Sequence, residues 1–276
     1  MEDFKKVIWI GIILIAVIGI GFGVYYFFFY KKSEKPFLVE ETKEEPSEVQ
    51  LEKPLREEVE RVLTERQLNL DKSDDLVSRL AKKLSPHPKL ALWLKNKDLI
   101  RKFVAVIDNI ADGMSPRSHL EFLSPRGNFE VIKRSRSYYL SPASYSRYNM
   151  VGGVFESLDT KECAKLYWEL KPIIQEAYFE LGYPNQDFHD TLFKAIVELL
   201  KTPMVDGEIL LEKKVVTYII ADYRLETLSE SQKHFLRMGA GNVQKIQAKL
   251  REFALVLGFP EDQIPKPFVY VPLKGR

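Results

Sequence analysis

The sequence predicts an α+β fold: a single, predominantly α-helical globular domain with a small β-hairpin, preceded by one transmembrane helix. Three observations support this. An uncharged apolar run opens the chain, apolar residues recur at helical spacing after residue 73, and a β-branched stretch near residue 210 has the pattern of a hairpin. The 276 residues suffice for one well-buried domain with accessory segments.

The apolar run covers residues 7–29, VIWIGIILIAVIGIGFGVYYFFF, and contains no charged residue. A helix of this length, rising about 1.5 Å per residue, covers the roughly 30 Å hydrocarbon core of a bilayer. A cleaved signal peptide is the alternative, but its shorter apolar stretch would end in small residues, whereas this run ends in aromatic rings. We therefore expect a short tail at 1–6 and an uncleaved, single-pass membrane anchor at 7–30 that contacts the lipid bilayer.

The side of the membrane is left open by the flanking charges. Lysines precede and follow the span in nearly equal number, with a slight excess after it that favours a cytoplasmic C-terminal side. A very short N-terminal tail is also typical of an anchor that exports its domain. Residues 31–56 mix Glu, Lys and Pro and predict a flexible charged linker, which leaves 57–276 as the folded domain.

Apolar periodicity and capping residues predict the helices of this domain. We expect them at 73–84, 90–94, 99–110, 145–158, 159–181, 187–200, 229–238 and 242–257. Asp159 and the capping-box sequence of residues 229–232 are expected to begin two of them, and Gly182 and Gly258, each followed by an aromatic residue and proline, to end two. Between helices, residues 115–142 predict an irregular insertion with a short strand at 129–132. A hairpin is expected from 208–211 and 215–220.

The stretch FLRMGAGNVQKI, residues 235–246, poses the question of whether its glycines cradle a phosphate. Phosphate-binding glycines follow a strand and open a helix, but the residues upstream of these predict a helix. We therefore expect a corner, with Gly239 ending one helix and Asn242 capping the next. A helix-turn-helix is a minor alternative, because membrane attachment and a net charge of +2 both disfavour nucleic acid.

Catalytic and metal-binding patterns are weak, and we expect no cofactor and no metal. The four histidines are not paired at ligand spacing, and Cys163 falls on an apolar helix face, as a buried structural thiol would. Asp108 and Asp112 could share a cation or a proton, although a solvated polar face explains them as well. An enzyme, specifically a hydrolase using Asp108, Asp112 or His119, stays open as a rival hypothesis.

One segment is locally basic. Between Ser115 and Asn149 there are six Arg and Lys residues but only two Glu, and aromatic residues are interspersed among them. The segment could therefore bind an anionic polymer or an acidic protein surface. The proposed contacts are Arg117, Arg126, Arg136, Arg147 and Tyr148. The alternative is that these arginines tie the loop to the domain through ion pairs and bonds to carbonyls.

Four stretches resemble a bacterial family catalogued as domain of unknown function 3014. They are FVAVIDNIADGMSPRSHLEFLSPRGNFEV, SYSRYN, LKPIIQEAYFELGYP and LSESQKHFLRMGAGNVQKIQAKLRE, within a similarity that covers about residues 75 to 260. The arrangement of a span, a variable tether and a C-terminal domain is also similar. The resemblance implies a domain exported into the bacterial cell envelope, on the periplasmic side, and it implies no activity, ligand or catalytic residue.

These observations favour a membrane-anchored, non-enzymatic binding or interaction domain, whose partner is an envelope protein or an anionic polymer. The envelope hydrolase is the first alternative, and a structural scaffold is the second. A broad apolar surface would favour the scaffold over a charged binding surface.

Overall fold

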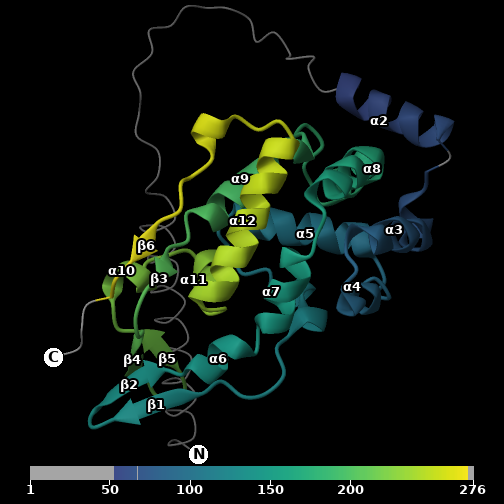
Figure 1. Ribbon diagram of the computed structural model, residues 1–276. Coiled ribbons are helices and arrows are strands. Elements are labelled where there is room, and N and C mark those ends of the chain that lie inside the picture. The colour runs from purple at the N-terminus through teal and green to yellow at the C-terminus, as the bar shows by residue number, and fades with distance from the viewer. Residues whose placement is uncertain (1–52, 67, 273–276) are drawn as a thin grey trace, which may run out of the picture. The chain divides into compact units, whose positions relative to one another are not determined.

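The structure is a computed structural model, and it describes residues 53–66 and 68–272 (Figure 1). The predicted span and most of the predicted linker lie outside these residues. Within them, none of the helices combines the length and the apolar character needed to cross a bilayer. The first described helix begins at Lys53, three residues before the end predicted for the linker.

Helices make up most of the described residues. The α-helices, in chain order, are α2 (Lys53–Glu65), α3 (Asp74–Ala81), α4 (Pro88–Trp93), α5 (Leu99–Ala111), α6 (Pro142–Ser146), α7 (Asn149–Glu156), α8 (Thr160–Glu180), α9 (Phe188–Leu200), α10 (Tyr223–Glu226), α11 (Glu230–Leu236) and α12 (Ala240–Val256). Short 3-10 helices lie at Leu70–Lys72, Lys82–Leu84, Arg117–His119, Glu121–Leu123 and Glu261–Gln263.

The strands form two small sheets. The first has four antiparallel strands in the order β1 (Val131–Arg134), β2 (Ser137–Leu140), β4 (Leu210–Lys213) and β5 (Tyr218–Ile220). The second pairs β3 (Met204–Val205) with β6 (Val269–Tyr270) in parallel. The predicted class, mostly helical α+β with a small antiparallel sheet, is confirmed for the described residues.

Local capping rules predicted several helix ends correctly. The Asp159 side chain accepts hydrogen bonds from two backbone N–H groups of the first turn of α8, and Ser229 and Gln232 form the expected capping box at α11. Gly182 and Gly258 follow the ends of α8 and α12 with φ of 112° and 85°, in the left-handed region that favours glycine.

The strand predictions were less accurate. The first strand begins at Val131, two residues after the predicted start, and the predicted hairpin is the second half of a four-stranded sheet. Val215 and Val216 were expected to begin a strand but lie in the turn between β4 and β5. The helix predicted at 145–158 is divided into α6 and α7, with α6 beginning early because Ser141 caps it and Pro142 suits its first turn.

Most of the buried apolar side chains belong to a core between helices. Residues from α2, α3, α5, α8, α9 and α12 contribute, including Val104, Ile173, Phe188 and Leu192, each at most 2% exposed. A second, smaller core lies between the four-stranded sheet and helices α10 and α11, around Ile209 and Leu225. Figure 1 shows α12 passing between α9 and α7, and the four strands beside α6.

The corner around Gly239 corrects one prediction. Gly239, with φ of 85°, is the N-cap of α12, and Asn242 lies inside the first turn instead of capping it. Asn242 is 6% exposed, and its Nδ2 donates to the Met238 carbonyl at 2.8 Å and to Asn149 Oδ1 at 3.1 Å. The amide therefore links α12 to the turn that follows α11 and to α7, which a solvent-facing cap could not do.

We expect the Gly152→Ala substitution to destabilise the domain. A Cβ at residue 152 would overlap the side chain of Asn242, which its hydrogen bonds hold in place, so the free energy of unfolding should fall by about 1 to 3 kcal/mol. Gly153→Ala is the matched control, because its Cβ would meet only His87 Nε2, at 3.9 Å.

Urea unfolding of the full chain in detergent, followed by circular dichroism, measures both variants. The control should be neutral, or stabilised by up to about 1 kcal/mol through helix propensity. Equal stabilities of the two variants would mean that the contact between α7 and α12 is not tight.

Candidate functional site

Two hairpin turns lie at the same end of the four-stranded sheet. Strands β1 and β4 are both antiparallel to β2, so they run in the same direction. The turns that follow them therefore lie at the same end of the sheet. These turns are residues 134–137 and 214–217. Because β2 alone separates β1 from β4, and neighbouring strands are about 4.8 Å apart, the two turns are about 10 Å apart.

The turn between β4 and β5 presents two valines to solvent. Val215 is 98% exposed and Val216 is 94% exposed. The Lys214 N–H donates to the Thr217 carbonyl at 2.8 Å, which closes a hairpin with the two valines at its tip. Neither valine has a positive φ, so the turn accepts most residue types, and neither its backbone nor core packing requires valine here.

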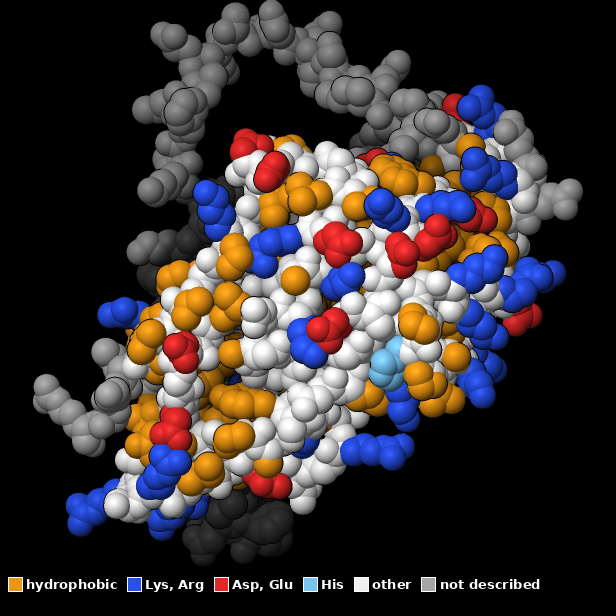
Figure 2. Space-filling view, viewed as in Figure 1, with side chains coloured by type: hydrophobic (Ala, Val, Ile, Leu, Met, Phe, Trp, Pro, Cys, Tyr) orange, Lys and Arg blue, Asp and Glu red, His pale blue; other side chains and the backbone are white. Residues whose placement is uncertain are grey.

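Basic residues lie beside these valines in the chain and in the neighbouring strand and turn. Lys213 ends β4 and Lys214 begins the turn that follows it. Arg136 lies in the neighbouring turn, and Lys133 lies in β1 with its Nζ 5.9 Å from the Tyr138 ring centroid. We call this group the basic sheet end: Lys133, Arg136, Lys213, Lys214, Val215 and Val216. Figure 2 shows blue Lys and Arg side chains at the end of the molecule where β1 and β2 lie.

Few carboxylates offset this charge within the described residues. Lys214 Nζ lies 2.5 Å from Glu212 Oε1, and both side chains are about half exposed. Arg134 lies 2.7 Å from Glu208 and packs over the Tyr139 ring, and the hydrogen bond to Glu208 raises the pKa of Arg134. Ion pairs this exposed are weakened by solvent and salt, so they hold the cations loosely. The sheet end therefore keeps a positive charge.

A chain of hydrogen bonds positions the sheet. Asn242 in α12 donates to the Tyr145 carbonyl in α6, at 3.4 Å. The neighbouring Ser144 is 1% exposed, and its Oγ accepts from the Glu130 N–H and donates to the Glu130 carbonyl, just before β1. Arg147 donates to the carbonyls of Ser144 and Gly127. The sheet is thus connected to the helical core through buried polar groups.

The residues predicted as contacts fall into two groups. Arg117, Arg126 and Arg136 are exposed, and no hydrogen bond or ion pair of their side chains is found within residues 53–66 and 68–272. Arg147 instead donates to two backbone carbonyls, and its guanidinium lies 5.7 Å from the Tyr148 ring centroid. Arg147 therefore has the loop-tying role that the sequence left open, while Arg136 belongs to the basic sheet end.

The residues of the rival hydrolase hypothesis are only partly brought together. Burial first, and then the nearby Asp112, raise the pKa of Asp108, which accepts a hydrogen bond from the Tyr183 hydroxyl at 3.4 Å. No hydrogen bond or ion pair of the described residues joins His119 to either aspartate. No group of three or more His, Cys, Asp or Glu in the described part of the chain could hold a metal ion.

A serine and a histidine that the sequence did not single out form a hydrogen bond. Ser115 Oγ lies 2.7 Å from His234 Nδ1, and burial, followed by the charge of Arg237, lowers the pKa of His234. A serine beside a neutral histidine is the geometry of an activated nucleophile. The cavity described next does not include either residue.

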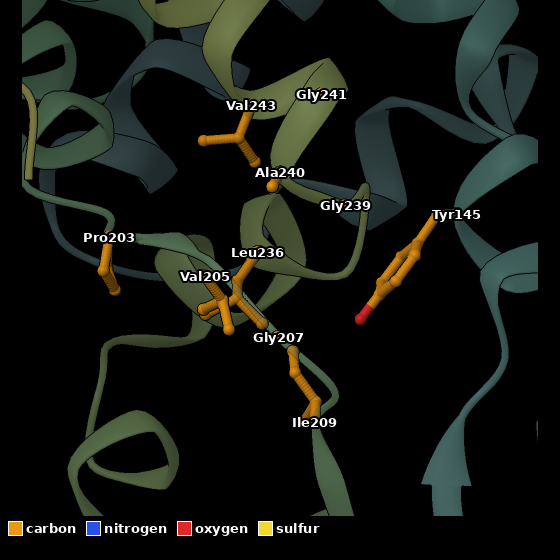
Figure 3. Close-up of a pocket in the computed structure, with 10 residues that line it drawn as sticks. All are labelled: Tyr145, Pro203, Val205, Gly207, Ile209, Leu236, Gly239, Ala240, Gly241 and Val243. Atoms are coloured by element: carbon orange, nitrogen blue, oxygen red, sulfur yellow. The ribbon is translucent and has the colours of Figure 1, made fainter. Parts of the chain in front are cut away.

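A cavity of about 300 Å³ lies between the start of α12, helix α6 and the segment from β3 to β4 (Figure 3). Figure 3 shows the Tyr145 ring across from Val205 and Leu236, with Gly239, Ala240 and Gly241 above. Burial raises the pKa of Tyr145 to about 12, so its hydroxyl stays protonated. The lining is otherwise apolar, and it suits a small apolar group.

Cys163 has the properties of a structural thiol. Burial first, and the charge of Asp159 second, raise its pKa to about 11, so the thiolate is scarce at neutral pH. The sequence predicted a buried thiol, and the structure leaves Cys163 half-buried.

Sequence reasoning missed Lys133, Lys213, Lys214 and the two valines as candidate site residues. The signal present was the charged centre of the predicted hairpin followed by β-branched residues. Their proximity to Arg136 could not be inferred, because it depends on the pairing of β2 with β4, which are about 70 residues apart.

Comparison with known proteins identifies one family. The family model described as "Protein of unknown function (DUF3014)" matches residues 99–254, from the start of α5 to near the end of α12. No curated protein and no solved structure matches the chain. The match spans more than half of the chain and includes both strands β1 and β2, the turn between β4 and β5, and the helices that position them. The chain therefore belongs to the DUF3014 family.

Proposed function

We propose that this protein is a membrane-anchored binding protein of the bacterial envelope. Residues 7–30 hold it in the bilayer, and its domain lies on the periplasmic side. The domain binds an anionic partner through the basic sheet end, with Arg117 and Arg126 as further exposed cations and Arg147 and Tyr148 supporting the loop.

The observation that carries this proposal is the arrangement of the basic sheet end. Four cations and two almost fully exposed valines lie at one end of a sheet whose residues Leu140, Leu211 and Ile220 are buried in the second core. Lys and Arg side chains attract anions, and exposed valines favour contact with apolar surface. This chemistry supports binding, whereas a hydrolase would need its acid, base and substrate cavity together.

A structural scaffold is the second candidate. Phe268, Val269 and Val271 are 56%, 55% and 68% exposed around β6, and they offer a second exposed apolar surface. If this face serves assembly, neutralising the basic sheet end will leave function intact.

We expect the double variant Arg136→Ala and Lys213→Ala to weaken binding of a polyanion. With heparin as the probe and the full chain in detergent, the affinity should fall roughly tenfold, and its dependence on salt should become shallower because fewer counterions are released. Arg117→Ala with Arg126→Ala is the matched control, since it removes the same charge from exposed arginines outside the two turns.

The control pair should lose less than half as much binding free energy as the sheet-end pair. A larger loss in the control would move the site to the contiguous segment around Arg117 and Arg126. If both folded variants bind heparin as the native chain does, the proposed anionic partner is wrong.

We expect the C-terminus to lie outside the cytoplasm. Alkaline phosphatase fused after Arg276 should be active in cells, because that reporter folds only in an oxidising compartment. A fluorescent protein that folds only in the cytoplasm, fused at the same place, is the matched control. Fluorescence with inactive phosphatase would contradict the periplasmic location and leave the binding surface to be judged by the heparin experiment.

A further inference from the structure

We propose that the ligand of the basic sheet end is a bilayer surface that contains anionic lipids, with Val215 and Val216 inserted among the lipid headgroups. The inference rests on the proposed function and names the ligand class of the same surface. It assigns the tip between β4 and β5 as a second attachment to the membrane, in addition to the span at residues 7–30.

The valines are the first argument. Val215 and Val216 are 98% and 94% exposed, so the folded domain leaves both in water. Neither has a positive φ, so the backbone of this turn accepts almost any residue and does not itself require valine. An apolar tip that serves neither the turn nor the core has a partner of low polarity. The boundary between headgroups and acyl chains is such a partner, and it admits a narrow hairpin.

The surrounding cations are the second argument. Lys213 and Lys214 directly precede the tip, and Arg136 and Lys133 lie on the strands and turn beside it. Binding at a bilayer surface increases with buried apolar area and with attraction to anionic lipids. Each Lys or Arg near such a surface strengthens binding roughly fivefold. Long aliphatic stems let these side chains reach phosphates while the valines lie deeper.

The combination favours a bilayer over a soluble polyanion. A polymer such as a polysaccharide would pair with the cations but would leave both valines in water. A bilayer satisfies both kinds of group at once, and the predicted anchor would keep such a surface near the domain. Charge and apolar character at the sheet end thus complement the same partner.

The test places a fluorescent label at the tip in the full chain. Two single-cysteine variants are made in a Cys163→Ala background, Val215→Cys at the tip and Val271→Cys as the matched control, since Val271 is also exposed, at 68%. Each is labelled with an environment-sensitive nitrobenzoxadiazole probe and reconstituted into vesicles. One lipid mixture is equimolar phosphatidylglycerol and phosphatidylethanolamine, and the other is phosphatidylcholine; both carry brominated acyl chains that quench the probe.

We expect quenching and a blue shift at residue 215 in the anionic vesicles, at least threefold stronger than in phosphatidylcholine, and little quenching at residue 271 in either. Adding Lys213→Glu and Lys214→Glu should abolish quenching at residue 215. Adding Lys95→Glu and Lys97→Glu, which reverses two exposed lysines elsewhere, should leave it unchanged.

Flotation of the vesicles separates the two proposals. A chain that floats while the probe at residue 215 remains unquenched overturns the lipid contact and leaves the anchor standing. Equal quenching at 215 and 271, or equal quenching in both lipid mixtures, also overturns a specific anionic contact. A chain that fails to float with either mixture overturns both the anchor and the tip.

Discussion

The arrangement of this domain depends on how closely helix α12 approaches helices α6 and α7. A Cβ on Gly152 would overlap the Asn242 side chain, and a Cβ on Gly239 would come within 2.7 Å of the Tyr145 ring. Because Gly152 and Gly239 have no side chain, the Asn242 amide can reach acceptors on three neighbouring segments. An amide buried to this degree must be hydrogen-bonded, so it selects one register of the helices.

That contact extends to the sheet. The Tyr145 carbonyl, which accepts a hydrogen bond from Asn242, belongs to the same short helix as Ser144. The Ser144 hydroxyl is hydrogen-bonded to both the backbone N–H and the carbonyl of Glu130, just before β1. The sheet is therefore positioned by buried polar groups at its inner end, while the ion pairs of the described residues at its outer end lie on the surface. Rigid support at one end, with exposed charge and one apolar tip at the other, supports the proposed binding surface there.

Local structure could be predicted where the deciding interactions are local. Asp159 and Ser229 cap helices through bonds to residues two or three positions away, and Gly182 and Gly258 end helices through their own backbone freedom. Asn242 was placed wrongly because its partners include Tyr145, nearly 100 residues away in the chain. The candidate site depends on the pairing of β2 with β4, and a strand pattern shows that a strand forms but not which distant strand it joins.

The central claim is that the outer end of the sheet is the working surface of this DUF3014 protein. Hydrogen–deuterium exchange of the full chain, compared between nanodiscs of anionic and of zwitterionic lipid, tests it most directly. The account predicts added protection in anionic nanodiscs over residues 133–138 and 211–218, with exchange in α8 and α9 unchanged. Protection confined to other surfaces, such as residues 266–272, or identical exchange in the two lipids would contradict it.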